Sequence, residues 1–202
     1  MSFSLTDEQL TIREAITKLC TDFEPNYWLD CDNEGRFPRE FVDAIAGGGW
    51  LGIAMPEEFG GSGLGITEAS LMMQAVTQSG AGFTGASAIH LNVFGLNPVV
   101  VFGTDEQKRR MLPPLINGEQ TACFGVTEPN AGLDTLSLET RAERTGDGYT
   151  VNGQKHWTSM AQRADKILLL ARTTPIGESE KRTHGLSLFF TDFNRDYLEV
   201  RE

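Results

Sequence analysis

Residues 123–134 read Cys-Phe-Gly-Val-Thr-Glu-Pro-Asn-Ala-Gly-Leu-Asp, and residues 153–159 read Gly-Gln-Lys-His-Trp-Thr-Ser. Each segment places a short run of β-forming residues before a cluster of hydroxyls and open backbone amides. Thr127 ends the first run, and Pro129 stops the strand because proline cannot donate to a ladder. The small residues that follow allow a close approach to the backbone, so several N–H groups can face a phosphate or a ring carbonyl.

The second segment follows Asn152-Gly153, a dipeptide typical of tight hairpin turns. We therefore expect a hairpin between strands at 149–151 and 154–157. The second strand would deliver Trp157 beside the hydroxyls of Thr158 and Ser159. Together the two segments suit an anionic, flat cofactor such as a flavin. The alternative is that Trp157 is a wall aromatic of a β-barrel with no ligand, because aromatic residues on strands are common for packing reasons.

The chain of 202 residues changes character near residue 120. Before this point apolar residues recur at helical spacing, and after it short apolar runs alternate with turn signals. The sequence predicts helices after capping boxes at Thr6 and Thr104, from Pro38 to a glycine triplet at 47–49, and over 66–76, and strands over 167–171 and 186–190. Helices first and strands afterwards predict an α+β fold with domains at 1–120 and 121–202.

The formal net charge of −11, without a dense block of Lys and Arg, argues against nucleic-acid binding. No apolar run reaches the ~20 residues needed to cross a bilayer, and the N-terminus has no signal-peptide pattern. Three cysteines without C-x-x-C spacing are expected to be reduced, which predicts a cytoplasmic protein. With three histidines and no cluster of His, Cys, Asp and Glu at ligand spacing, no metal site is predicted.

The two opening segments resemble motifs of the acyl-CoA dehydrogenase family of flavoproteins, T-E-P-x-A-G-S-D and N-G-x-K-x-W-[IT]-[ST], which occur in its middle domain. Residues 50–63 and 102–108 resemble two further family segments, in the right order. The resemblance runs from Ser4 to about Arg201. It implies an N-terminal all-α helical domain followed by an antiparallel β-barrel middle domain, incomplete here, and a C-terminal four-helix domain that is absent.

The resemblance also implies which residues form one wall of the FAD site. Phe124, Val126 and Thr127 would line the isoalloxazine ring, Trp157 would cover its edge, and two hydroxyls would donate to a ring carbonyl. The expected cofactor-binding residues are Phe124, Gly125, Val126, Thr127, Leu133, Trp157, Thr158 and Ser159. Leu133 departs from the family pattern, which has serine there, so any contact of this position with the cofactor or the acyl-CoA substrate must come from the main chain.

The chemistry that the resemblance implies is oxidation of the α,β bond of an acyl-CoA thioester, with FAD taking up the hydride. The family's catalytic base is a glutamate of the C-terminal domain, so no residue here is nominated as catalytic, and Glu128 is expected to be structural. The implied partners are an acyl-CoA substrate, an electron-transfer flavoprotein or similar acceptor, and further copies of the chain in a homodimer or homotetramer. The implied process is fatty acid and lipid metabolism.

The sequence leaves three alternatives open. The chain can be a piece of an ordinary dehydrogenase, a short paralogue that has lost catalysis and acts as a binding or interaction module, or a fragment of a related flavin oxidase or monooxygenase. CoA is polyanionic, so the chain's negative charge would oppose its approach and recognition would be local. Arg141, Lys155 and Arg163 are the candidate phosphate contacts, each weighed against an ordinary surface charge.

Overall fold

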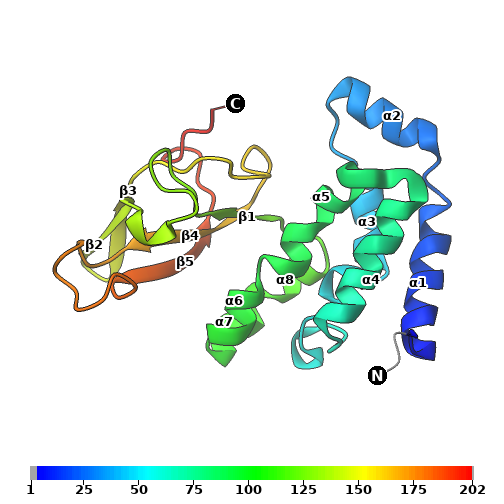
Figure 1. Ribbon diagram of the computed structural model, residues 1–202, viewed down its shortest axis with the longest axis horizontal. Helices are drawn as coiled ribbons and strands as arrows, with labels where there is room; N and C mark the ends of the chain where they lie inside the picture. Colours follow the sequence, from blue (N-terminus) through cyan, green and yellow to red (C-terminus); the bar gives the residue numbers. More distant parts are fainter. Residues whose placement is uncertain (1–3, 202) are drawn as a thin grey trace. The chain divides into compact units, whose positions relative to one another are not determined.

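A computed structural model describes residues 4–201 of the chain. It divides into two compact units, Met1–Gln120 and Thr121–Glu202, which are described here one at a time. The first unit is helical and the second contains a β-sheet (Figure 1). This confirms the predicted α+β class.

The helical unit begins and ends its helices where short-range signals place them. Thr6 and Thr104 both form the predicted capping boxes, in which the threonine hydroxyl accepts from the backbone of Gln9 or Gln107 and the glutamine side chain accepts in return. The α-helices are α1 (Asp7–Cys20), α2 (Pro25–Glu34), α3 (Arg39–Gly47), α4 (Ile66–Val76), α5 (Gly82–Phe94), α6 (Asn97–Phe102), α7 (Asp105–Met111) and α8 (Pro113–Ile116). Shorter turns are η1 (Trp50–Gly52), η2 (Glu57–Phe59) and η3 (Thr77–Ala81).

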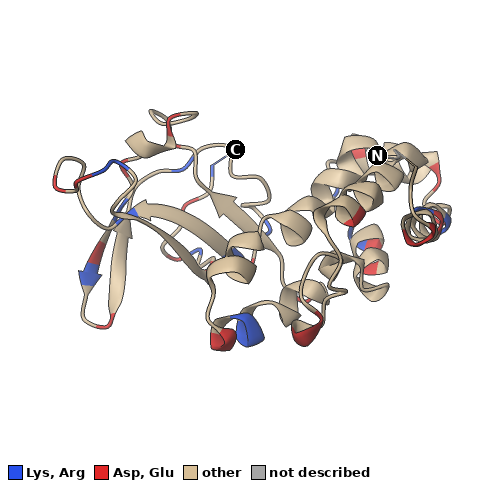
Figure 2. Ribbon diagram, turned by 60° about the horizontal axis from the view of Figure 1, so that its bottom comes forward, with Lys and Arg blue, Asp and Glu red and all other residues tan. Residues whose placement is uncertain are grey.

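Helix α7 shows how charge placement supports a short helix. Its first turn carries Asp105 and Glu106, and its last turn carries Lys108, Arg109 and Arg110. Figure 2 shows the two signs at opposite ends of this helix. Each sign opposes the partial charge of the helix end that it occupies, so the pattern stabilises α7 by complementing its dipole.

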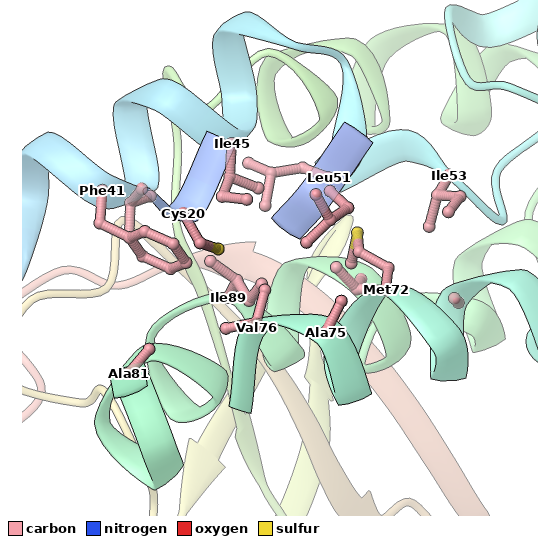
Figure 3. Close-up of a cluster of buried hydrophobic side chains, with 14 of the residues drawn as sticks. Cys20, Phe41, Ile45, Leu51, Ile53, Met72, Ala75, Val76, Ala81 and Ile89 are labelled. Carbon is pink, nitrogen blue, oxygen red and sulfur yellow. The ribbon is translucent and has the colours of Figure 1, made fainter. Parts of the chain in front are cut away.

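The core of the helical unit is built from one apolar stripe on each long helix. Figure 3 shows Phe41 and Ile45 of α3 meeting Met72 and Val76 of α4, with Ile89 of α5 beside them. All five side chains are almost completely buried. The free cysteines Cys20, Cys31 and Cys123 are likewise buried. The helical unit therefore owes its order to apolar burial rather than to disulfides.

The apolar stretch Ile66–Phe102 passes, by length and composition, for a helix that could cross a membrane. The chain does not run through it as one rod, because Gly80 at φ 102° breaks the helix at η3. Helix α4 then packs against both α5 and α1. The stretch thus forms the separate helices α4, α5 and α6 rather than one long helix, and core helices of a folded domain pass the same test of length and composition.

The second unit is organised around a central strand. Its strands are β1 (Ala122–Gly125), β2 (Arg141–Thr145), β3 (Gly148–Asn152), β4 (Lys166–Arg172) and β5 (Leu186–Asp192), with a 3-10 turn η4 (Thr135–Ser137). Strand β5 pairs with every residue of β4 and takes one edge. Strands β1 and β2 share the other edge, since β1 pairs with 166–169 and β2 with Arg172. The segment 126–140 is therefore a loop that leaves the sheet and returns to the same edge.

Two details of the expected sheet are wrong. The strands were expected to be antiparallel, but β1 and β4 run parallel, so the sheet is mixed. The hairpin turn is at Gly146-Asp147, between β2 and β3, and not at Asn152-Gly153. The ring of Tyr149 packs on Phe189 at 5.0 Å, which brings β3 towards β5 across the curled sheet. Closure into a barrel stays a prediction.

Gly61 offers a test of the helical unit, because a Cβ there would lie 2.2 Å from the carbonyl oxygen of Met55. Backbone atoms cannot move aside as a side chain can, so Gly61→Ala is expected to lower the free energy of unfolding by about 1–3 kcal/mol. Gly47→Ala is the control, since a Cβ at this helical position meets nothing within 4 Å. Denaturant unfolding monitored by circular dichroism compares the two, and equal midpoints would contradict the packing described.

Candidate functional site

The two segments that define the site meet at the end of β1. The backbone N–H of His156 donates to the carbonyl of Thr127 at 2.7 Å. The Lys155 ammonium donates to the carbonyl of Val126 at 3.0 Å. Since β1 ends at Gly125, residues 155–158 lie directly against the first residues of the loop 126–140.

This meeting explains why the second expected strand does not form. The backbone of His156 bonds to Thr127, so 154–157 runs as an irregular segment rather than as a partner of β3. Strand β3 ends at Asn152, and the chain crosses from there to β1. The predicted neighbourhood of Trp157 and Thr127 is present, but it is made by a crossing segment and not by a hairpin.

Glu128 sits at the centre of this junction and is buried. Its carboxylate accepts from the backbone N–H groups of Glu139 at 2.6 Å and Thr140 at 2.9 Å, and from the Lys155 ammonium at 2.8 Å. Burial alone would raise the pKa of Glu128, but these three donors outweigh it and lower the pKa to about 2. Glu128 is thus an ionised structural anchor, as its place in the turn predicted.

Lys155 has a different role from the one considered for it. Its side chain is only 9% exposed, and its ammonium group donates hydrogen bonds to the Glu128 carboxylate and the Val126 carbonyl. Burial, which disfavours the charged form, lowers the pKa of Lys155, although the Glu128 carboxylate opposes this shift. Lys155 therefore holds the two segments together and is not a surface contact for phosphate. Arg141 is exposed and pairs with Glu143 at 2.7 Å.

Trp157 combines an unfavourable backbone conformation with a side chain that is open to solvent. Its φ of 57° lies in the left-handed region that favours glycine, and its side chain is 84% exposed. The ring touches only the neighbouring imidazole of His156 among the described aromatic contacts, at 5.1 Å. A backbone held in this conformation while the ring stays open to solvent indicates a surface prepared for contact.

The hydroxyl residues after Trp157 differ from each other. The Thr158 hydroxyl is buried and has no hydrogen-bond partner among the described residues. Ser159 is exposed, and its backbone N–H donates to the carbonyl of Trp157 at 3.1 Å. A buried hydroxyl without a partner costs free energy, so Thr158 is the position where a ligand would supply the missing bond.

The remaining predicted residues lie along β1 and the loop. Gly125 is buried, and a Cβ there would come within 3.1 Å of Ile167 and Leu169. Phe124 points outward and is 37% exposed. Leu133, near the tip of the loop, is fully exposed. Next to it Asp134 pairs with Arg182 of the β4–β5 loop at 2.6 Å, and the Ser137 hydroxyl joins both.

A separate cavity of about 350 Å³ lies in the helical unit. It is lined by Ala54, Met55, Leu64, Ile66, Val93, Phe94, Asn97 and Val100. Seven of these side chains are apolar, so the cavity favours an aliphatic group over a charged one. No group of three or more His, Cys, Asp and Glu within residues 4–201 is placed to hold a metal ion.

The sequence comparisons identify the family. The acyl-CoA dehydrogenase N-terminal domain matches residues 6–119, and the acyl-CoA dehydrogenase middle domain matches residues 123–202. The chain belongs to the acyl-CoA dehydrogenase family. It is 39% identical over 155 residues to the acyl-CoA dehydrogenase FadE26 of Mycobacterium tuberculosis, which covers 76% of this chain and 38% of that protein.

Two solved structures show the same fold. The FAD complex of PigA matches with a TM-score of 0.86 at 25% identity, over 95% of this chain and 49% of that one. The ChsE4-ChsE5 complex from Mycobacterium tuberculosis matches with a TM-score of 0.81 at 32% identity, over 95% of this chain and 49% of that one. The chain therefore spans half or less of the length of these relatives.

The Glu128 anchor makes the stability of the sheet unit depend on pH. The shift of its pKa from an ordinary 4.5 to about 2 corresponds to about 3 kcal/mol, present above pH 4.5 and lost as the pH falls towards 2. Glu128→Gln is expected to remove about 3 kcal/mol at pH 7, and its difference from the wild type should shrink on acidification. Hydrogen exchange of the β4 amides at pH 7 and at pH 3, which lies inside this window, measures this.

The exposed Glu178→Gln variant is the matched control, because it removes the same charge from a surface loop. It is expected to leave β4 protection unchanged. Equal protection of β4 in Glu128→Gln and Glu178→Gln at pH 7 would show that the carboxylate does not anchor the junction.

Proposed function

We propose that this chain takes part in the α,β-dehydrogenation of an acyl-CoA thioester with FAD as the cofactor. Membership of the family supports the reaction class, and the FAD complex of a structural neighbour supports the cofactor. The observation that carries the proposal is the junction at Thr127 and His156, which presents the exposed Trp157 next to Thr158, whose hydroxyl has no hydrogen-bond partner within residues 4–201.

The residues present fit a flavin on chemical grounds. A flat heteroaromatic ring needs an aromatic or apolar face and hydrogen-bond donors for its carbonyls. Trp157 offers the first, and the Thr158 hydroxyl offers a buried donor that nothing in the described chain uses. Val126 and Thr127, which are partly buried at the end of β1, would complete this wall.

FAD, when bound, would supply the acceptor for the hydride that leaves the β-carbon. The residues of this chain would bind and orient it: Trp157 by covering the ring, and Thr158 by donating to a ring carbonyl. No residue here is assigned to removal of the α-proton. The Glu128 carboxylate is excluded from that role, because it is buried and already accepts three donors.

The partners are proposed from the same resemblance. They are an acyl-CoA, an electron-transfer flavoprotein or similar acceptor, and further protein chains in an oligomer, with a cytoplasmic location and a role in lipid metabolism. The matching ChsE4-ChsE5 complex supports association with another chain. The chain's net charge of −11 opposes a polyanionic CoA at long range, so recognition would depend on local contacts.

The second candidate is a binding module without dehydrogenase activity, in which Glu128, already bonded to three donors, only holds the junction together. Reduction of the flavin by acyl-CoA separates the two candidates. If the protein is a dehydrogenase, we expect the 202-residue chain alone to be colourless and inactive. We expect a longer natural polypeptide to carry a flavin whose absorption bleaches when acyl-CoA is added. A natural 22.2 kDa protein that binds FAD but never bleaches would favour the binding module.

Trp157 provides the sharpest test of the flavin wall. Trp157→Ala and Thr127→Val are each expected to shift the flavin absorption bands and weaken FAD retention, because each removes a ring contact. Trp157→Gly separates function from stability. It removes the ring and relieves the positive φ, so FAD affinity should fall while the unfolding free energy holds or rises by up to about 1 kcal/mol. Unchanged spectra and affinity in Trp157→Ala and Thr127→Val would contradict the assigned wall.

Leu133→Ser is expected to strengthen binding of the cofactor or of acyl-CoA. The substitution adds a donor where the family has serine, and a hydrogen bond to a charged group contributes about 1.5–3 kcal/mol. Affinity should therefore increase by about tenfold to about a hundredfold, as measured by fluorescence titration of the complete protein. Leu133→Ala, which adds no hydroxyl, is the control. A rise in Leu133→Ala equal to that in Leu133→Ser would attribute the effect to loss of the exposed leucine.

A further inference from the structure

Residues 136–140, the arm of the loop 126–140 that returns to the sheet, are hydrogen-bonded to buried charged side chains on two sides. The N–H groups of Glu139 and Thr140 donate to the Glu128 carboxylate. On the other side, the Arg172 side chain donates to the carbonyls of Leu136 at 2.6 Å and Leu138 at 3.2 Å. The Arg172 backbone N–H adds a bond to the carbonyl of Thr140 at 2.8 Å. Residues 136–140 are thus fixed between an anion and a cation.

Arg172 is unusual because its charge is buried and unbalanced. The residue is 4% exposed, and its side-chain acceptors are neutral carbonyls. No carboxylate forms an ion pair with it among residues 4–201, and its Nη1 is buried without a hydrogen-bond partner there. Buried guanidinium groups are normally paired, since desolvation without a countercharge costs free energy.

The charges beneath the loop do not cancel. Lys155 and Arg172 contribute two buried cations, and Glu128 contributes one buried anion. All three bond to the main chain of the loop or of the β1 end that leads into it. Among these three buried groups one positive charge is therefore uncompensated, at Arg172 beside Leu136 and Leu138 of the loop. The loop's own carboxylates, Asp134 and Glu139, are exposed to solvent. In a low-dielectric interior such a charge acts on a bound anion with little screening.

We propose that Arg172 is a positioning residue that makes the loop 126–140 selective for the diphosphate ester of its ligand. The guanidinium holds the arm 136–140 in place and supplies the positive potential that the bound anion balances. The inference rests on the proposed function, in which two ligands carry a diphosphate, the dinucleotide FAD and coenzyme A. Arg172 acts through the loop and is not assigned a contact with the reacting atoms.

The first experiment uses inorganic pyrophosphate as the probe and the 202-residue chain as it exists. Titration followed by amide NMR is expected to give saturable shifts at residues 127–140. Arg172→Met should weaken this binding at least about tenfold, and Arg172→Lys, which keeps the charge, should stay within about threefold of the wild type. Arg144→Met, on the exposed strand β2, is the matched control and should leave the affinity unchanged.

The second experiment separates an electrostatic role from a structural one. In the complete protein, Arg172→Met should lower the affinity for FAD at least about tenfold more than the affinity for riboflavin, which has the ring but no diphosphate. The pair coenzyme A and pantetheine makes the same comparison for the substrate, so the two arms show which diphosphate the loop holds. If Arg172→Met does not fold, Arg172→Lys provides the test. It should keep its affinity for pyrophosphate although its free energy of unfolding is lower.

Three results would overturn the proposal. One is the absence of any saturable response of the wild type to pyrophosphate. Another is a response confined to exposed cations such as Lys181 and Arg182. The third is an equal loss of charged and neutral ligands in Arg172→Met. The proposed function fails separately, through a complete protein that binds neither FAD nor riboflavin.

Discussion

The sheet unit depends on one buried carboxylate. Glu128 follows β1 by three residues, yet it bonds to the two residues just before β2 and to the segment beyond β3. A single side chain therefore fixes three pieces of chain that are far apart in sequence. Its low pKa records how strongly these donors favour the ionised form. Without this anchor, the loop 126–140 would lose its bonds between Glu128, the arm at 139–140 and Lys155, and only the contacts of Arg172 and Arg182 would hold its middle.

The central strand explains why the anchor is placed where it is. Because β1 and β2 share one edge of β4, the loop between them must leave and return within a short span. Its arms come close together, and their backbone groups need partners away from the ladder. Glu128 accepts from the amides of one arm, and Arg172, the last residue of β4, donates to its carbonyls. The two charges replace the hydrogen bonds that a third strand would have made.

Sequence patterns predicted what local signals control. The capping boxes at Thr6 and Thr104 and the strands around 167–171 and 186–190 depend on neighbouring residues, and all four are present. The direction of β1 relative to β4 depends on long-range pairing, which no local pattern encodes. Asn152-Gly153 carries the stronger turn signal, but the chain turns at Gly146-Asp147, where Gly146 has a φ of 60°. Residues 154–157 do not pair with β3, and His156 bonds to Thr127 instead. The interior roles of Lys155 and Arg172 were missed for the same reason. An arginine that closes a buried apolar strand was the available signal.

The site contains two kinds of residue: buried ones that stabilise the fold, and exposed ones whose role we assign to ligand binding. Glu128, Lys155 and Arg172 are buried, and each is bonded to the main chain of a neighbouring segment. Trp157 is the reverse case, since its side chain is 84% exposed and its backbone is held at a positive φ. A glycine or an exposed polar residue would cost less there. No contact within residues 4–201 offsets that cost. We therefore infer that tryptophan is present at position 157 because a ligand or partner covers its ring. The bonds of Lys155 to Glu128 and of the His156 backbone to Thr127 fix the two residues before Trp157, and so determine where its ring is presented.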